Sequence, residues 1–248
     1  MTVLNWNPLR KALAMCRHKN VAVPIWWRDD DAVAMTSHLA RLNETSVRTG
    51  IPVHLAIVPA NVDPLLPSLI NTSQLLPVVH GWAHLDHSDS RTKKNEFLTK
   101  RSGAAHETLN AIKVMQTLFG ADMRRMFVPP WNRINAEISM VLKNQGYRVL
   151  STYGARTATS AAGLDLVNTH LDPIFWGGSR DLIDPDVLIA KTAAHLHSRT
   201  EGREDAFEPF GLLSHHLVHT EAIWSFIEAF LNEMRMGGAT VWSMENDK

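Results

Sequence analysis

The alternation of short apolar runs with longer amphipathic runs most constrains how this 248-residue chain can fold. Eight runs have strand length; they span 21–27, 53–58, 75–80, 126–128, 147–151, 165–169, 210–214 and 239–243. Helical patterns lie between them, at about 33–49, 62–72, 94–119, 135–145, 184–198 and 220–236. Strands that alternate with helices form parallel sheets. We therefore predict a single α/β domain over residues 1–248, most simply a (β/α) barrel with about seven or eight parallel strands, or else an open doubly wound sheet.

Composition excludes several classes of protein. Lys plus Arg and Asp plus Glu number 25 each, and this balance gives no support to binding of nucleic acid or of a membrane surface. A lone cysteine, Cys16, excludes an internal disulfide framework and a cysteine-rich zinc module. The first twenty residues contain no continuous apolar segment of a secretory signal, so we expect a cytoplasmic protein. Neutral charge with abundant apolar residues is compatible with a homo-oligomer.

Polar clusters recur where the predicted strands end. Five such clusters occur, at 28–31, 80–87, 129–133, 170–172 and 215–219. The carboxyl ends of parallel strands meet at one edge of the sheet, which is where ligands and catalytic groups collect. Neither a dinucleotide-binding GxGxxG nor a GxSxG nucleophile elbow is present. The chain therefore points to a site at this edge that works without either motif.

Three adjacent carboxylates, Asp29, Asp30 and Asp31, follow the apolar residues Ile25–Trp27. Neighbouring carboxylates repel one another and an apolar approach removes water from them, and a divalent cation relieves both penalties. A solvated turn in which Asp31 caps the following helix is the alternative. The pattern favours metal binding or acid–base chemistry.

Two histidines, His80 and His84, are four residues apart in the sequence His-Gly-Trp-Ala-His. On a helical turn this spacing lets both imidazoles share a metal, although the glycine also fits an irregular loop. Two histidines and one aspartate leave open positions on a zinc-like ion, as a hydrolytic site requires. We therefore predict a divalent metal ion as the cofactor, and the donor types favour Zn²⁺.

A further histidine pair, His215 and His216, ends the apolar run Leu212–Ser214. Histidine titrates near neutral pH, so one of the two is a candidate general acid, although a histidine there is also compatible with a satisfied core residue. The sequence does not choose between them.

At these residues the chain resembles the polysaccharide deacetylases, the NodB-homology or carbohydrate esterase family 4 type, as a divergent bacterial branch. The similar segments are an apolar strand ending in Asp-Asp, a His-x-x-x-His, a Pro-Pro-aromatic segment and an apolar strand ending in His. They are found at 27–31, 80–84, 128–131 and 212–216, so the resemblance covers nearly the whole chain, about residues 21–242. It implies a distorted (β/α) barrel and a metal-dependent deacetylase acting on an N-acetylated carbohydrate.

The resemblance also implies the roles of the residues. Asp31, His80 and His84 match the metal ligands, Asp30 matches the catalytic base, and His215 or His216 matches the catalytic acid. A shift of one residue would make Asp29 the base and Asp30 the ligand. A metal-dependent hydrolase of another amide and a non-catalytic carbohydrate-binding barrel remain the alternatives.

The chain departs from the family where an arginine normally precedes Pro-Pro and contacts the catalytic aspartate. Val128 stands there, and Arg28 or Arg133 are the candidates to supply the missing charge. Flat aromatic faces stack on sugar rings, so we predict substrate binding by Trp131 and Trp176 together with Arg133. The expected partner is a carbohydrate or a small amide.

Overall fold

The computed structural model describes residues 4–245. Nine strands of this part form one sheet in the order β6-β7-β5-β4-β3-β2-β1-β8, with β9 added beside β1. The strands are β1 (Pro24–Ala32), β2 (Val53–Ile57), β3 (Leu75–His80), β4 (Met126–Val128), β5 (Val149–Leu150), β6 (Ser160–Ala161), β7 (Leu164–Leu166), β8 (Phe210–Ser214) and β9 (Thr240–Val241). All pairings are parallel except β6 with β7.

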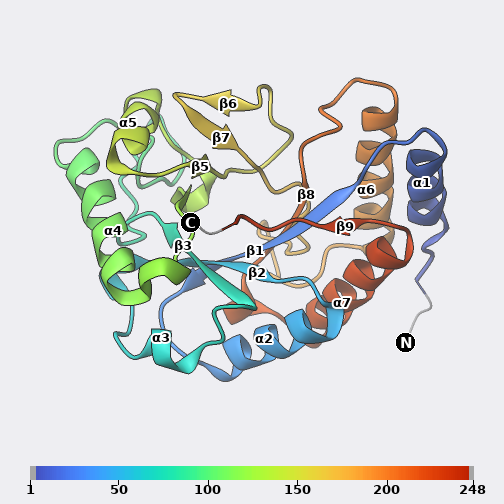
Figure 1. Ribbon diagram of the computed structural model, residues 1–248, viewed down its shortest axis with the longest axis horizontal. Coiled ribbons are helices and arrows are strands. Elements are labelled where there is room, and N and C mark those ends of the chain that lie inside the picture. Colours follow the sequence, from blue (N-terminus) through green and yellow to red (C-terminus); the bar gives the residue numbers. More distant parts are fainter. Residues whose placement is uncertain (1–3, 246–248) are drawn as a thin grey trace.

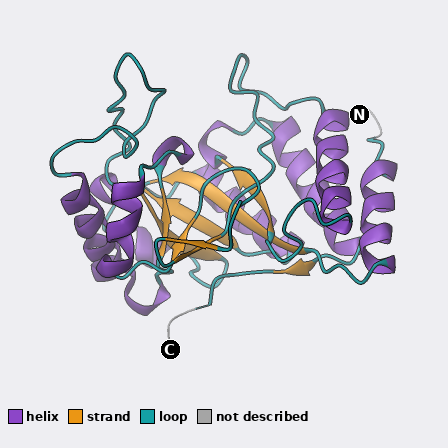
Figure 2. Ribbon diagram, turned by 90° about the horizontal axis from the view of Figure 1, so that it is seen from above, coloured by secondary structure: helices purple, strands orange, loops and turns teal. Residues whose placement is uncertain are grey.

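The sheet is curled into a distorted barrel, and the helices cover its outside (Figure 1, Figure 2). The chain just after β7 joins the two ends of the sheet, because Leu171 bridges Leu212 of β8 and Tyr153 bridges Thr169. The predicted parallel α/β barrel is thus confirmed, and the open doubly wound sheet is excluded.

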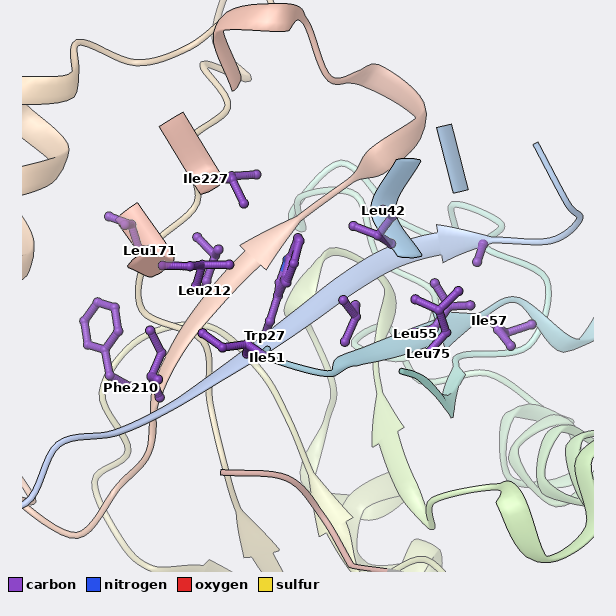
Figure 3. Close-up of a cluster of buried hydrophobic side chains, with 14 of the residues drawn as sticks. Trp27, Leu42, Ile51, Leu55, Ile57, Leu75, Leu171, Phe210, Leu212 and Ile227 are labelled. Carbon is purple, nitrogen blue, oxygen red and sulfur yellow. The ribbon is translucent and has the colours of Figure 1, made fainter. Parts of the chain in front are cut away.

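Seven α-helices of the described chain have these bounds: α1 (Asn7–His18), α2 (Ser37–Thr49), α3 (Leu66–Leu69), α4 (Ala104–Phe119), α5 (Ala136–Leu142), α6 (Pro185–Thr200) and α7 (Glu221–Met236). Apolar faces of these helices and the outward-facing side chains of the strands make the main core. Figure 3 shows part of it, with Leu42 of α2 and Ile227 of α7 among the strand residues Trp27, Leu55 and Leu212. No helix between residues 4 and 245 is both long enough and apolar enough to span a membrane.

A second, smaller cluster fills the inside of the barrel. Trp26, Ala56, Val78 and Val128 belong to it, and Trp242 packs against it from the C-terminal segment. The rings of Trp26 and Trp242 lie 5.5 Å apart at a steep angle. Inward and outward residues alternate along each strand, so the apolar runs predicted as strands are buried on both faces.

The main differences from the predicted elements are in where strands and helices begin and end. β1 was expected to end at residue 27 and runs to Ala32, because its ladder with β2 and β8 continues through Asp29. The helix predicted over 94–119 begins only at Ala104, and the one over 62–72 is reduced to a single turn at Leu66–Leu69. Helix α2 is capped by Thr36, whose side chain accepts a hydrogen bond from the Leu39 N–H, so Asp31 is not a helix cap.

Candidate functional site

A pocket of about 1040 Å³ opens at the carboxyl end of the barrel. Asp30 and Asp31 of β1, His80 of β3, His84 and His215 all line it. All five predicted polar clusters contribute residues to the lining, and the cluster at 170–172 does so through Asp172. The structure thus brings the predicted chemistry together at the edge where parallel strands present their ligand sites.

The alternation of β1 separates its charged residues. Trp26, Arg28 and Asp30 face the inside of the barrel, whereas Trp27 and Asp29 face the outer layer, where the Trp27 indole and the Asp29 carboxylate both bind the Ser214 hydroxyl. Period-two geometry alone places Arg28 next to Asp30 and removes Asp29 from the pocket.

Asp31 returns to the pocket through an irregularity in the strand. The register of β1 against β2 shifts between Asp29 and Ala32, and Asp31 has a left-handed backbone with φ 77°. A β-bulge re-aims a side chain in this way, and left-handed φ is strained for a residue other than glycine. The bend points the Asp31 carboxylate at the two histidines.

Asp31, His80 and His84 form a cluster that could hold a metal ion, with one ligand atom from each within 4.8 Å of the others. The Asp31 Oδ1 atom lies 3.1 Å from His80 Nε2 and 3.2 Å from His84 Nε2. His84 comes from an irregular loop after β3, so the helical turn that HxxxH spacing allows is not formed.

The hydrogen bond on the far side of His80 tests whether a cation fits. His80 Nδ1 donates to the Val128 carbonyl oxygen at 3.0 Å, which leaves the Nε2 lone pair facing Asp31. Metal-bound histidines are oriented in this way by a backbone carbonyl on the other nitrogen. A carboxylate oxygen and a ring nitrogen that both present lone pairs at this distance require a cation between them, or a proton. The donor set therefore fits a divalent metal ion.

Charges in the cluster are strongly coupled. Burial opposes a charge on His80, but the Asp30 and Asp31 carboxylates outweigh it and hold the pKa of His80 above its ordinary value. Burial likewise opposes ionisation of Asp31, and its contacts with His80 and the nearby histidines hold the pKa of its carboxyl well below the usual range. For His84, burial and the neighbouring His80 lower the pKa. The Asp31 carboxylate is thus ionised and ready to receive a cation.

The loop that carries His84 is fixed by Glu96, a buried carboxylate that the sequence did not single out. Glu96 accepts hydrogen bonds from the N–H groups of Trp82 and Ala83, at 3.1 and 2.8 Å. Gly81 has φ 57°, and a Cβ atom there would lie 2.3 Å from a Glu96 carboxylate oxygen and 2.5 Å from Pro130. Only glycine allows this close approach, so Gly81 and Glu96 together set the separation of the two histidines.

Arg28 is the one of the two candidate arginines that contacts Asp30. Its guanidinium is fully buried and holds Asp30 with two hydrogen bonds, of 2.9 and 3.0 Å. The remaining N–H groups reach Ser151 Oγ and Asn132 Oδ1 at 2.8 and 2.7 Å. Arg133, the other candidate, instead donates to the Lys94 carbonyl oxygen at 2.6 Å. The cation that contacts Asp30 therefore comes from the same strand as Asp30 itself.

The two neighbouring histidines after β8 face different surroundings. His215 lines the pocket, whereas His216 is fully buried and its Nδ1 lies 2.5 Å from Asp29 Oδ1. Burial opposes the charge on Asp29, but His216 holds the pKa of this carboxyl below its ordinary value. Asp29 and His216 therefore form a buried pair behind the pocket, and the groups that face the pocket are Asp30, Asp31 and His215.

The predicted substrate-binding residues Trp131, Arg133 and Trp176 all line the pocket. The Trp131 ring lies 4.3 Å from that of His84, and the Trp176 ring lies 4.7 Å from that of His215. The Trp176 indole donates to Asp172 at 2.8 Å, and burial raises the pKa of the Asp172 carboxyl. His170 lies outside the pocket, beside His195 in a separate cavity of about 180 Å³.

Backbone strain is concentrated around this pocket. Of the seven non-glycine residues with left-handed φ in the described chain, five line it; these are Asp31, His84, Trp131, Asn132 and Arg180. Such strain collects at functional sites, where packing holds side chains in positions that relaxed backbone would not give. Sequence reasoning placed Asn132 in a polar cluster without giving it a role and did not name Arg180, since left-handed φ at a non-glycine residue leaves no clear signal in the sequence.

Comparison with solved structures shows the fold. A peptidoglycan N-acetylglucosamine deacetylase, solved with an N-hydroxybenzamide derivative, matches with a TM-score of 0.56 and 11% identity over 89% of this chain and 86% of that one. A family 4 acetyl xylan esterase from Clostridium thermocellum, in complex with a cobalt ion, matches with a TM-score of 0.51 and 14% identity over 88% and 86%. This protein has the carbohydrate esterase family 4 fold.

The same fold also occurs in a protein without activity. A family 4 pseudoenzyme from Bacillus anthracis matches with a TM-score of 0.52 and 13% identity, over 89% of this chain and 63% of that one. No family model and no curated protein matches the sequence. The carbohydrate esterase family 4 fold alone therefore does not settle activity, and the residues of the pocket have to decide it.

Proposed function

We propose that this protein is a metal-dependent hydrolase that removes an acetyl group from an N-acetylated carbohydrate. One observation carries the proposal: the Asp31–His80–His84 cluster shares its pocket with Asp30, which Arg28 clamps, and with His215. These are the groups that hydrolysis of an amide needs, namely a metal site, a base and an acid.

Asp31, His80 and His84 would hold the cation, and we propose zinc because two imidazoles and one carboxylate form a typical catalytic zinc set. When bound there, a divalent ion polarises an acyl carbonyl and lowers the pKa of water. The chain's own contribution is to fix the His80 ring through Val128 and the His84 loop through Glu96.

Asp30 is the proposed base that accepts a proton from the attacking water. Its two hydrogen bonds from Arg28 fix the plane of the carboxylate inside the barrel, at a position that lines the pocket. A base that is already held in the correct orientation loses less entropy to reach the reactive geometry, and this difference contributes to catalysis.

His215 is the proposed acid, which donates a proton to the departing amine, a poor leaving group as an anion. We assign this role to His215 because His216 is buried against Asp29 and does not line the pocket. The Trp131 backbone N–H is the donor that we assign to the developing oxyanion. Trp131 and Trp176 offer faces on which a sugar ring stacks.

A non-catalytic carbohydrate-binding barrel is the second candidate, supported by the pseudoenzyme with the same fold. The buried Arg28–Asp30 pair favours the enzyme over this candidate, since it keeps the base carboxylate paired although Val128 has replaced the family arginine. Hydrolysis of a different amide at the same site is the remaining alternative. Screening small amides alongside acetylated sugars distinguishes it from deacetylation of a sugar.

The test compares Asp30→Asn with Asp31→Asn, and uses Asp165→Asn, an exposed aspartate on β7, as the control. Metal content is measured by elemental analysis, and acetate release from N-acetylglucosamine oligomers is measured with added zinc or cobalt. We expect Asp30→Asn to keep the metal and lose about 10²–10⁴-fold in rate. Asp31→Asn should lose the metal, and the control should change neither.

Two results would count against the proposal. Wild-type protein that binds no metal and releases no acetate after metal addition would contradict the enzyme, and sugar binding that survives Asp30→Asn would then favour the binding barrel. If Asp30→Asn abolished metal binding and Asp31→Asn did not, the assignment of the two aspartates would be wrong by one residue.

A further inference from the structure

The charged side chains of the pocket are not evenly paired. Its acids all have partners: Asp30 is bound by Arg28, Asp31 lies against two histidines, and Asp172 accepts from the Trp176 indole and the Ile174 N–H. Three cations line the same pocket, namely Arg133, Arg180 and Lys191. Within residues 4–245, no carboxylate lies within ion-pair distance of any of the three.

Lys191 is held in place by a neutral group. It lies on α6 one turn after Val187 and Leu188, which also line the pocket. Its ammonium donates to the Tyr153 hydroxyl at 2.8 Å, and that hydroxyl donates in turn to the His170 carbonyl oxygen at 3.1 Å. Tyr153 therefore only accepts from the lysine. No carboxylate of the described chain pairs with the ammonium, and two of its N–H groups remain for a ligand.

Arg180 belongs to the chain segment between Trp176 and α6. Its backbone is left-handed, with φ 58°, and its N–H donates to the Phe175 carbonyl oxygen at 3.1 Å. The side chain lines the pocket and has no acidic partner in the described chain. A guanidinium in a pocket binds carboxylate and phosphate groups through two parallel N–H bonds.

A divalent ion at Asp31 would leave this pocket with an excess of positive charge, because Arg28 already balances Asp30. A concave site of one sign attracts ligands of the opposite sign. We propose that the acetylated sugar carries an acidic group, a carboxylate or a phosphate, and that Lys191 and Arg180 bind it. This inference rests on the proposed function, since it names the substrate class of the same site.

The first experiment compares three substrates at pH 7 and low salt. N-Acetylglucosamine oligomers are neutral, N-acetylmuramic acid carries a carboxylate, and N-acetylglucosamine 1-phosphate carries a phosphate. We expect at least about tenfold higher kcat/KM for one acidic sugar than for the neutral one, weakening with added salt. Which acidic sugar wins distinguishes carboxylate from phosphate.

The variants Lys191→Gln and Arg180→Gln should each reduce this preference about tenfold, mainly through KM. Lys113→Gln, an exposed lysine on α4, is the matched control and should keep it. Equal turnover of neutral and acidic sugars by the wild type, or a preference that survives both variants, would overturn the proposal.

Binding to metal-free protein separates this inference from the proposed function. The same three sugars are titrated into metal-free protein, and binding is measured by calorimetry. Without the metal, any attraction between the anion and the metal is absent. Preferential binding of an acidic sugar that both variants weaken supports the anion site even if no acetate is released. Acetate release from the neutral sugar, with no binding preference, overturns the anion site and leaves the deacetylase intact.

Discussion

The two ends of the barrel use a buried histidine in opposite ways. At the carboxyl end, His80 gives one ring nitrogen to a backbone carbonyl and presents the other to Asp31. At the amino end, His54 of β2 donates from Nδ1 to the Trp27 carbonyl oxygen and accepts at Nε2 from the Met244 N–H. Both rings are buried on neighbouring strands. The number of nitrogens that the backbone occupies decides which histidine is able to bind a ligand.

The surroundings reinforce this difference. The His54 ring stacks on Trp242 at 5.5 Å and meets the edge of Trp26 at 5.2 Å, so the C-terminal segment closes the amino end of the barrel. Burial lowers the pKa of His54 to about 3, and the ring stays neutral. At the carboxyl end the cluster faces an open pocket. One end of the barrel seals the core, and the other end leaves polar groups to be completed by a ligand.

The largest expected effect is on metal affinity. His80→Ala removes a ligand, and since changes in groups that only orient a ligand already cost about 10–100-fold, we expect the loss to reach about 100-fold or more. His54→Gln should leave metal affinity unchanged, because His54 does not face the cluster. Competition with a chromophoric chelator measures both. A similar loss of metal affinity in the two variants would contradict the difference between the two ends of the barrel.

Two glycines sharpen the comparison. Gly81→Ala should weaken metal binding about 10–100-fold, since its Cβ would push against Glu96 and shift the loop of His84. Gly211→Ala on β8 would place a Cβ atom 2.5 Å from the Trp26 indole nitrogen, inside the barrel. We expect it to lower the free energy of unfolding by about 1–3 kcal/mol while the folded protein keeps its metal affinity.

Chelator competition and urea unfolding, applied to both glycine variants, check this pair. A Gly211→Ala protein with intact stability but weakened metal binding would show that the two ends are coupled, contrary to expectation.

The smallest predicted effect is on pH dependence. Unfolded histidine titrates near 6.5 and folded His54 near 3, so below about pH 6.5 the unfolded state binds a proton that the folded state excludes. The stability that neutral His54 allows is complete above pH 6.5 and falls as pH decreases toward 3. Between pH 7.5 and pH 5, His54→Gln should lose about 2 kcal/mol less than the wild type. Urea unfolding at the two pH values measures this. An equal fall in the free energy of unfolding for the wild type and for His54→Gln would contradict the prediction.

Buried strands were the most predictable part of the fold. The apolar runs 75–80, 126–128 and 210–214 coincide with β3, β4 and β8, because strands covered on both faces are continuously apolar. β1 was predicted too short, since its last residues are charged and a charged run reads as a turn. Residues 95–96 were predicted as helix, yet Asn95 bonds the Leu98 and Thr99 N–H groups and Glu96 bonds a distant loop.

The candidate site was predictable as a set of residues, but its internal pairing was not. His80 and His84 came from motif spacing and Asp31 from the family resemblance, and the structure places the three together. Whether Asp29 or Asp30 faces the pocket depends on which face of β1 each side chain points to. In the same way, His215 and His216 follow β8 directly, and their side chains point in different directions. A shift of one residue in a strand moves each side chain to the opposite face, and the composition of the segment does not reveal which of the two arrangements forms.

Arg28 has a consequence for how this site can change over generations. The cation and the carboxylate that it orients are encoded two codons apart, so they are inherited together. Within the segment Pro129–Arg133, Arg28 bonds to Asn132, whose side-chain oxygen accepts from it, so the other residues of the segment are less constrained by the charge beneath Asp30. We therefore expect sequence change to gather in those other residues, while Arg28 and Asp30 change together or not at all.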